Sequence, residues 1–337
     1  MRAILQSTYG SVDSLRLGDV ARPEPAEDEV LIRVRAASVH PDVWHVVAGR
    51  PAVLRLMGSG VQRPRERIPG TDVAGVVESV GTAVTRFKPG DDVFGETVRG
   101  VGWRNGGAYA EYVAAPDAGL ALKPSTVSFE EASAVPTAGL IALNHLPQSK
   151  VPPGSRVLVN GAAGGVGALA VQLAKAYGAE VSGVDHASKL DLVRAVGADR
   201  AIDYAQEDFT LTGDKWDLIF DVPGNHTFRD VRRALDTRGH YVLIGHDGFG
   251  AIGHRWLGSM PRVLGLMARS AVTPQLRGAN FAPPDKRQLM SILARFMETG
   301  ELRVVLDRTF PLAQTPEALR HMMSGQPVGR VVVQIDG

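Results

Sequence analysis

The feature that most constrains the fold of this chain is a glycine-rich turn between an apolar strand and a helix. Residues 156–160 (RVLVN) predict a buried strand, and residues 166–177 predict a helix that Gly178 closes. The turn between them reads Asn160-Gly161-Ala162-Ala163-Gly164-Gly165-Val166-Gly167. Glycines bring backbone N–H groups close to a diphosphate, and the start of a helix favours negative charge. The order of these elements therefore predicts a dinucleotide-binding loop.

An acidic residue follows at the spacing typical of such loops. The next strand, residues 180–184, leads to Asp185, eighteen positions after Gly167. An acid about 20 positions on is expected to bond the ribose hydroxyls of the dinucleotide. Its carboxylate would repel a 2′-phosphate, whereas nearby Lys189 would attract one. We therefore expect the cofactor to be NAD(P)H, with a slight preference for NADH.

Strands and helices alternate on both sides of this loop. Helices are predicted at 129–146, with a break near Pro136, and at 188–196, and further strands at 216–222 and 240–245. This alternation is typical of a parallel sheet covered by helices on both faces. We expect an α/β domain with a doubly wound, Rossmann-type parallel sheet.

The first part of the chain, to about residue 122, has a different pattern. Short strands are predicted at 29–36, 74–80 and 108–114, with glycine, proline and aspartate turns between them. Many short strands joined by such turns indicate a small barrel or sandwich.

The tail of the chain adds two helices and two strands. The pattern predicts a helix at 285–298, a short strand near 303–306 and a final strand at 330–335. A second helix is expected to begin at Thr315, which would serve as its N-cap, with Pro316 in the first helical position.

Residues 250–273 combine apolar side chains at helical spacing with Arg255, Arg262 and Arg269. That spacing predicts an amphipathic helix. Ordinary packing, a lid over a hydrophobic substrate, a dimer contact and a membrane-surface helix are all compatible with it.

Composition excludes several classes of chemistry. The chain has no cysteine, which excludes disulfides, thiolate catalysis and cysteine-ligated zinc. The formal net charge of +1 gives no general attraction to nucleic acid. No apolar run of about eighteen residues predicts a membrane span, and the N-terminus has no apolar secretory core. We therefore expect a cytoplasmic protein.

Several motifs in this chain occur together in one superfamily. In chain order they are residues 36–42 (AASVHPD), 69–75 (PGTDVAG), 87–95 (FKPGDDVFG), 106–112 (GGAYAEY), 161–167 (GAAGGVG), 197–204 (GADRAIDY) and 329–333 (GRVVV). On these residues the chain resembles the medium-chain dehydrogenase/reductase superfamily and is similar to its zinc-independent quinone oxidoreductase branch.

The resemblance implies two domains. A GroES-like β-barrel domain would comprise residues 1–122 and be completed by residues 271–337. A Rossmann domain that binds the nicotinamide cofactor would comprise residues 123–270. The active cleft would lie between them.

The resemblance also bears on metal binding. The positions that hold zinc in zinc-dependent relatives would be His40, Thr71 and Ala134 or a neighbour, of which only His40 is a good ligand. The alternative is an improvised site from His40, Asp42, His45 and Asp72. We expect no zinc and no other bound metal.

Conjugate reduction, in which hydride adds to the β-carbon of an enone or quinone, needs less activation by a Lewis acid than reduction of a simple ketone. The reason is that the conjugated oxygen accepts the developing charge. We expect His40 to donate to the substrate oxygen, with Asp42 polarising its imidazole and His45 lying further back. Tyr109 is a further candidate donor.

The remaining cofactor contacts follow from the resemblance. Thr137 and the pair Gly245-His246 would surround the nicotinamide. Tyr204 and Asn225 would approach the adenosine half, and Arg330 would reach toward the cofactor.

Together these features predict an NAD(P)H-dependent oxidoreductase that transfers hydride to a small hydrophobic quinone or α,β-unsaturated carbonyl compound. The alternatives are an alcohol dehydrogenase or carbonyl reductase, and a cofactor-binding regulatory protein without turnover. We expect a monomer or homodimer.

Overall fold

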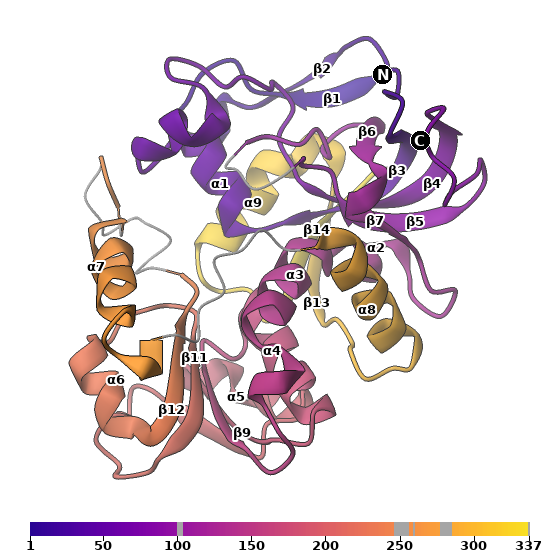
Figure 1. Ribbon diagram of the computed structural model, residues 1–337. Coiled ribbons are helices and arrows are strands. Elements are labelled where there is room, and N and C mark those ends of the chain that lie inside the picture. The colour runs from indigo at the N-terminus through magenta and orange to yellow at the C-terminus, as the bar shows by residue number, and fades with distance from the viewer. Residues whose placement is uncertain (100–103, 246–255, 259, 277–284, 336–337) are drawn as a thin grey trace. The chain divides into compact units, whose positions relative to one another are not determined.

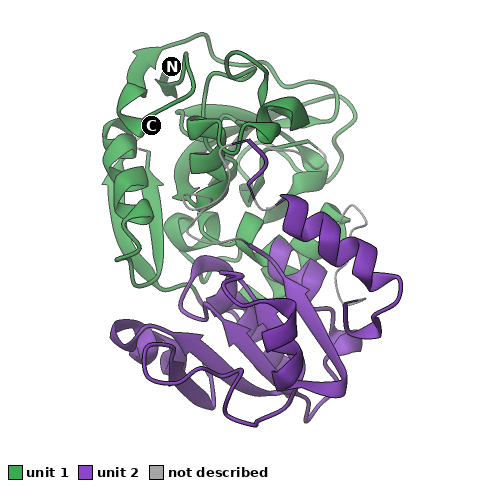
Figure 2. Ribbon diagram, turned by 90° about the vertical axis from the view of Figure 1, so that its left-hand side faces the viewer, with its two compact units in different colours: residues 1–140, 283–300, 304–337 green, residues 141–282, 301–303 purple. Residues whose placement is uncertain are grey.

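The computed structural model describes residues 1–99, 104–245, 256–258, 260–276 and 285–335. The chain divides into two units, shown in different colours in Figure 2. Unit 1 comprises residues 1–140, 283–300 and 304–337, and unit 2 comprises residues 141–282 and 301–303. These bounds differ from the predicted ones, because residues 123–140 fall in unit 1 and residues 271–282 in unit 2.

Unit 1 is organised around β-sheets (Figure 1). Within its described residues, a seven-stranded sheet has the order β13-β14-β3-β4-β5-β7, with β6 paired to β3 off this path. Its strands are β3 (Glu29–Val39), β4 (Asp72–Val80), β5 (Asp92–Glu96), β6 (Tyr112–Pro116), β7 (Leu120–Leu122), β13 (Leu306–Pro311) and β14 (Arg330–Gln334). A separate antiparallel pair consists of β1 (Arg2–Leu5) and β2 (Arg16–Asp19). Because β14 pairs antiparallel with β3, the tail of the chain completes the same unit as its start.

The helices of unit 1 begin and end at residues whose chemistry explains the bounds. They are α1 (Pro41–Ala48), α2 (Phe129–Ser133), α3 (Pro136–His145), α8 (Lys286–Glu298) and α9 (Thr315–Met323), of which α3 continues into unit 2. Ser128 and Glu131 form a reciprocal capping box at the start of α2. The predicted break at Pro136 is confirmed, because a proline is accepted in the first turn of a helix and not in its interior.

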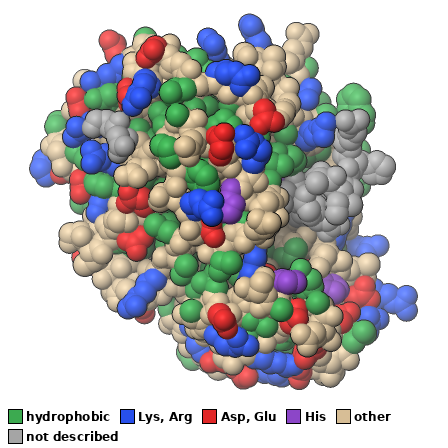
Figure 3. Space-filling model, turned by 180° about the vertical axis from the view of Figure 1, so that it is seen from behind, with side chains coloured by type: hydrophobic (Ala, Val, Ile, Leu, Met, Phe, Trp, Pro, Cys, Tyr) green, Lys and Arg blue, Asp and Glu red, His purple; other side chains and the backbone are tan. Residues whose placement is uncertain are grey.

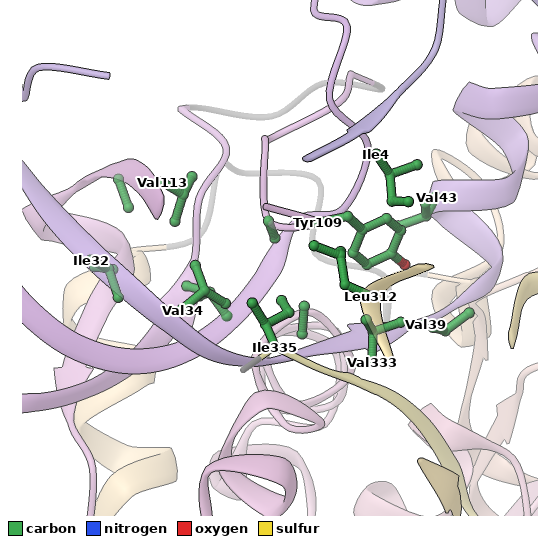
Figure 4. Close-up of a cluster of buried hydrophobic side chains, with 14 of the residues drawn as sticks. Ile4, Ile32, Val34, Val39, Val43, Tyr109, Val113, Leu312, Val333 and Ile335 are labelled. Atoms are coloured by element: carbon green, nitrogen blue, oxygen red, sulfur yellow. The ribbon is translucent and has the colours of Figure 1, made fainter. Parts of the chain in front are cut away.

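The core of unit 1 gathers side chains from segments far apart in the sequence. Figure 4 shows Ile4 of β1, Val39 of β3, Val43 of α1 and Val333 of β14 around the ring of Tyr109. All five are buried. Burial of each such side chain stabilises the fold by roughly 1.5–3 kcal/mol.

Unit 2 has the predicted parallel sheet. In the part of the unit that the structure describes, five parallel strands have the order β10-β9-β8-β11-β12. They are β8 (Arg156–Asn160), β9 (Glu180–Asp185), β10 (Arg200–Asp203), β11 (Trp216–Asp221) and β12 (Leu235–Leu243). The strand order reverses at β8, so the edge beyond the carboxyl end of β8 is the ligand-binding position of a doubly wound sheet.

Four helices can be assigned in the described part of unit 2 besides the end of α3. They are α4 (Gly165–Ala176), α5 (Leu190–Ala195), α6 (Phe228–Ala234) and α7 (Met260–Ser270). The core includes Leu158, Ile219 and Tyr241, and Leu266 of α7 packs against it. None of the helices in the described ranges combines the length and apolar character that crossing a bilayer requires.

Two predicted strands begin later than expected, and one predicted N-cap is wrong. The strand predicted at 108–114 begins at Tyr112, because the backbone of Tyr109 bonds instead to Pro69 and Ile4. The strand predicted at 303–306 begins at Leu306, because the backbone of Arg303 is engaged by the side chain of Gln172. Thr315 is not an N-cap, because its hydroxyl donates back to Leu312 O.

Two elements of unit 2 differ from the predicted pattern in extent. Helix α6 was not predicted, although Thr227 caps its first turn through Asp230 N. Strand β12 begins at Leu235 and not at His240. Of the predicted amphipathic segment 250–273, residues 250–255 and 259 lie outside the described residues, and the rest contains α7.

Candidate active site

The glycine-rich loop is shaped by contacts that leave no room for side chains. Gly161 has a φ of 80°, in the left-handed region that favours glycine. A Cβ on Gly167 would lie 2.0 Å from Gly161 O and 2.8 Å from Gly161 C. Helix α4 can therefore approach the end of β8 this closely only because residue 167 is glycine.

The start of α4 is free of any acidic side chain that would compete with an anion. Its N-cap is Gly164, which has no side chain to accept from the first N–H groups, and the first turn contains no acid. Gly165 and Val166, at its first positions, are half-buried. Uncapped N–H groups at a helix N-terminus form an anion site, so these residues fit the diphosphate of a dinucleotide.

Asp185 lies at the end of β9 and is bonded to the loop. Its carboxylate accepts hydrogen bonds from Ala163 N at 2.9 Å and from His186 N at 2.9 Å. The ring of Tyr204 lies 5.8 Å from that of His186, between ring centroids. The structure thus places Asp185, the predicted ribose contact, and Tyr204, the predicted adenosine contact, at the β9–β10 edge. Lys189 ends the short 3-10 helix Ala187–Lys189 that follows β9.

Asn160 and Asn225 meet on the other side of the loop. Asn160 Nδ2 donates to Asp221 Oδ1 at 2.8 Å and to Asn225 Oδ1 at 3.1 Å. Asn225 therefore lies where β8 and β11 are neighbours. Gly245 lies against the residue that follows β11, since its Cβ would be 2.3 Å from Val222 O.

His246, the other predicted nicotinamide contact, lies outside the described residues.

The central group of unit 1 is the buried carboxylate of Asp72. It accepts hydrogen bonds from Ser38 Oγ, Thr71 Oγ1 and both the backbone N–H and the hydroxyl of Thr137, at 2.5–3.2 Å. Its side chain is completely inaccessible to solvent. Asp72 thus joins β3, β4 and the start of α3, and it determines where the Thr137 hydroxyl points.

His40 is connected to Asp72 through a hydroxyl group. His40 Nε2 lies 2.8 Å from Thr71 Oγ1, and Thr71 Oγ1 donates to Asp72 Oδ1. Since the hydroxyl proton is given to the carboxylate, we assign the imidazole proton to Nε2 and the lone pair to Nδ1. In that tautomer Nδ1 of His40 would accept a hydrogen bond from a ligand.

Burial controls the protonation of this cluster. It lowers the pKa of His40 to about 4, with the nearby Arg330 acting in the same direction and Asp42 against it. Burial raises the pKa of Asp42, and the negative charges of Asp72 and Glu96 raise it further. The imidazole is therefore neutral near pH 7.

Three more charged side chains extend the cluster. Lys286 Nζ pairs with Glu96 Oε2 at 2.5 Å, and Glu96 Oε1 accepts from Thr137 Oγ1 at 3.3 Å. Arg330 donates weakly to Ser38 Oγ at 3.5 Å, and among the described residues its buried Nε has no hydrogen-bond partner. Glu96 and Lys286 were missed at the sequence level, because neither lies in a motif that predicts their pairing.

Tyr109 and His45 are held by the backbone. The Tyr109 hydroxyl donates to Ser38 O at 2.9 Å from a fully buried position. His45 Nδ1 lies 2.7 Å from Arg50 O. The geometry gives both residues packing contacts inside unit 1.

Comparison with known proteins gives consistent matches along the chain. The sequence-family model named alcohol dehydrogenase GroES-like domain matches residues 26–125. The family model named zinc-binding dehydrogenase matches residues 196–333. The chain is 33% identical to the 2-methylene-furan-3-one reductase of Solanum lycopersicum, over 99% of this chain and 79% of the relative. It is also 33% identical, with the same coverage, to a chloroplastic NADPH-dependent alkenal/one oxidoreductase of Arabidopsis thaliana.

Among solved structures, the quinone oxidoreductase from Coxiella burnetii matches with a TM-score of 0.81 and 27% identity, over 100% of this chain and 99% of that one. The chain belongs to the medium-chain dehydrogenase/reductase superfamily. It is an oxidoreductase of the quinone oxidoreductase-like branch, with the GroES-like and Rossmann domains of that family.

The residues at the zinc positions of this family do not fit zinc. Thr71 offers a hydroxyl that is already bonded to His40 and Asp72, and Ala134 is a buried residue without any donor atom. In the described ranges, no group of three or more His, Asp or Glu side chains is arranged to hold a metal ion. A tetrahedral zinc site needs three nitrogen, sulfur or carboxylate ligands, and these positions supply one.

Proposed function

We propose that the protein reduces small hydrophobic quinones or α,β-unsaturated carbonyl compounds with a reduced nicotinamide dinucleotide, independently of zinc. The observation that carries the proposal is the close packing of Gly167 on Gly161, which presents an uncapped helix N-terminus beside β8. The names of the tomato, Arabidopsis and Coxiella relatives support the substrate class.

Different residues of unit 2 would bind different parts of the cofactor. The N–H groups at the start of α4 would bind the diphosphate, and Asp185 would accept from the ribose hydroxyls. Tyr204, more than half exposed, offers a ring face on the adenosine side. When bound, the reduced nicotinamide supplies the hydride for the reaction.

The choice between NADH and NADPH depends on the charges at the end of β9. Both oxygens of Asp185 already accept backbone N–H groups, so this carboxylate is held where a 2′-phosphate would come. We propose a preference for NADH on this ground, although the Arabidopsis relative is named as NADPH-dependent. Lys189 is the side chain that would reverse the preference.

The polar cluster of unit 1 is proposed to shape the substrate site. The hydroxyl of Thr137 and the Nε2 proton of His40 are both directed along hydrogen bonds that end on Asp72. His40 therefore contributes an acceptor nitrogen, and Asp42 lies near enough to influence the protonation of that imidazole. The proton that completes reduction is then drawn from water, because these side chains have their protons engaged.

Purified protein and a panel of substrates test the proposal. Oxidation of NADH or NADPH would be followed by absorbance with benzoquinones, enones, alkenals, aldehydes and simple ketones. Turnover with the quinones or enones and none with the ketones supports the proposal. Turnover restricted to ketones, with stoichiometric zinc by metal analysis, would favour an alcohol dehydrogenase, and tight binding without turnover would favour a regulatory protein.

A cytoplasmic location and a monomeric or homodimeric state are further predictions. Cell fractionation would test the first, and light scattering of the purified chain would test the second.

A further inference from the structure

The loop after β11 lies beside the glycine-rich loop that is proposed to bind the cofactor. Residues 222–226 pack against the glycine-rich loop, since a Cβ on Gly161 would lie 3.0 Å from Pro223 Cδ and 3.3 Å from Val222 Cβ. The loop is attached to β8 by Val222 N, which donates to Asn160 O, and by Asn225. A shift of this loop would therefore move the surface next to the diphosphate site.

Arg262 of α7 bonds to this loop at two points. Its Nη1 donates to Gly224 O and its Nη2 donates to His226 O. The two carbonyl groups thus share one planar guanidinium, a geometry that a lysine ammonium cannot reproduce. Gly224 has a φ of 66°, so the loop turns through a left-handed residue at the point that Arg262 holds.

The same arginine lies beside a buried acid–phenol pair. Tyr241 Oη donates to Asp221 Oδ2 at 2.8 Å, while Asp221 Oδ1 accepts from Gly224 N at 3.0 Å and from Asn160 Nδ2. Burial and the charge of Asp221 raise the pKa of Tyr241, and the positive charge of Arg262 opposes that rise. Asp221 and Arg262 therefore hold the loop at its N–H and its C=O groups respectively.

Among the described residues of helix α7, none is fully buried. Leu266 packs partly against the core, whereas Leu264 and Met267 are exposed by 56% and 39%. A Cβ on Gly265 would meet no atom within 4 Å. The paired bonds of Arg262 attach this exposed helix to the loop after β11.

We propose that Arg262 is a positioning residue, which holds residues 222–226 in the conformation that accepts the nicotinamide half of the cofactor. The loop follows β11, on the opposite side of the strand-order reversal from the β9–β10 edge that takes the adenosine half. This inference rests on the proposed function, because it assumes that the protein binds the dinucleotide.

The test compares Arg262→Ala with Arg262→Lys and with Arg269→Ala, an exposed arginine on the same helix. Titration calorimetry would measure the Kd of NADH and of ADP, which lacks the nicotinamide half. We expect Arg262→Ala to weaken the binding of NADH about 10-fold. Arg262→Lys should weaken it only about 3-fold, because the lysine ammonium can still bond to one of the two carbonyl groups, whereas the planar guanidinium bonds to both. ADP binding should change less than about 2-fold, and Arg269→Ala should bind both as the wild type does.

Hydrogen exchange of the loop amides provides a second measurement without cofactor. Arg262→Ala should accelerate exchange at residues 224–226 about 10-fold relative to Arg269→Ala. Equal loss of NADH and ADP affinity, or unchanged NADH affinity, would overturn the positioning role while leaving the proposed function intact. A wild type that binds neither NADH nor NADPH would overturn both.

Discussion

The proposed cofactor site of unit 2 and the polar cluster of unit 1 differ in the groups that form them. In unit 2, the cofactor edge consists of glycine backbone and a helix N-terminus, with Asp185 at its rim. In unit 1, the polar cluster consists of side chains from segments more than 200 residues apart in sequence, from Ser38 to Arg330, around the carboxylate of Asp72. Charged side chains of both signs are otherwise scattered over the surface seen in Figure 3, in keeping with the small net charge.

This difference indicates which substitutions each region tolerates. A backbone site has no group that titrates near neutral pH, but a single added methyl group displaces it. A side-chain cluster has some freedom in volume, but the loss of one charge or one acceptor leaves several buried donors without partners. The following substitutions test that contrast.

The largest effect is expected for Gly167→Ala. Its Cβ would overlap the carbonyl of Gly161, so α4 must move away from β8, at a cost of about 1–3 kcal/mol in the free energy of unfolding. We expect the Kd of NADH, measured by calorimetry, to rise at least about 100-fold as the N–H groups of α4 lose their alignment. Gly265→Ala is the matched control, because its Cβ meets no neighbour; unchanged affinity in Gly167→Ala would refute the assignment of the loop.

The next largest effect is expected for Asp72→Asn. The amide NH2 would face donors that the carboxylate now accepts from, among them both donors of Thr137. Unpaired buried donors cost about 1–3 kcal/mol each, so we expect turnover to fall about 30-fold while the Kd of NADH stays within about 2-fold. Asp13→Asn, at an exposed carboxylate, should leave both quantities unchanged. Equal damage to cofactor binding would show that the two regions are not separable in this way.

His40 should make stability depend on pH. Its folded pKa of about 4 lies below the ordinary value of 6.5, so the unfolded chain takes up a proton first as the pH falls. The stabilisation is therefore complete above about pH 6.5 and is lost toward pH 4. The loss amounts to about 2 kcal/mol at pH 5.

Urea unfolding at pH 7 and pH 5 would measure this loss in wild type and in His40→Asn. The difference between the two proteins isolates His40, because the raised pKa values of Asp42 and Asp72 favour the folded state as the pH falls in both. The exposed His186→Asn serves as the control. Identical pH dependence in wild type and His40→Asn would contradict a neutral, buried imidazole.

The smallest effect is expected for Asp185→Asn. Removing the charge at the end of β9 should shift the ratio of the NADPH and NADH dissociation constants about 10-fold toward NADPH, since a unit charge near a phosphate is worth about 1–2 kcal/mol at a protein surface. Calorimetry with both cofactors would measure the ratio, with the fully exposed Asp191→Asn as the control. No shift in the ratio would mean that another group decides the preference.

Local signals predicted some elements closely and others poorly. Strand β8 has the predicted bounds, and the helix broken at Pro136 was foreseen, because both depend on residues next to each other in sequence. The start of β13 was misplaced because Arg303 bonds to Gln172, and sequence distance hides that partner. Helix α6 was missed although Thr227 and Asp230 carry a capping pattern.

The sequence by itself determined the glycine-rich turn, the parallel sheet around it and the family, because glycine spacing and hydrophobic alternation act over a few neighbouring residues. It also indicated that the zinc positions lack ligands, which residue types alone decide. Only the tertiary structure decided that His40 bonds to Thr71, that Glu96 pairs with Lys286 and that Arg262 bonds to the loop after β11. Those outcomes depend on which distant segments pack together, and the direction of a buried hydrogen bond depends on every donor and acceptor that the packing brings within reach.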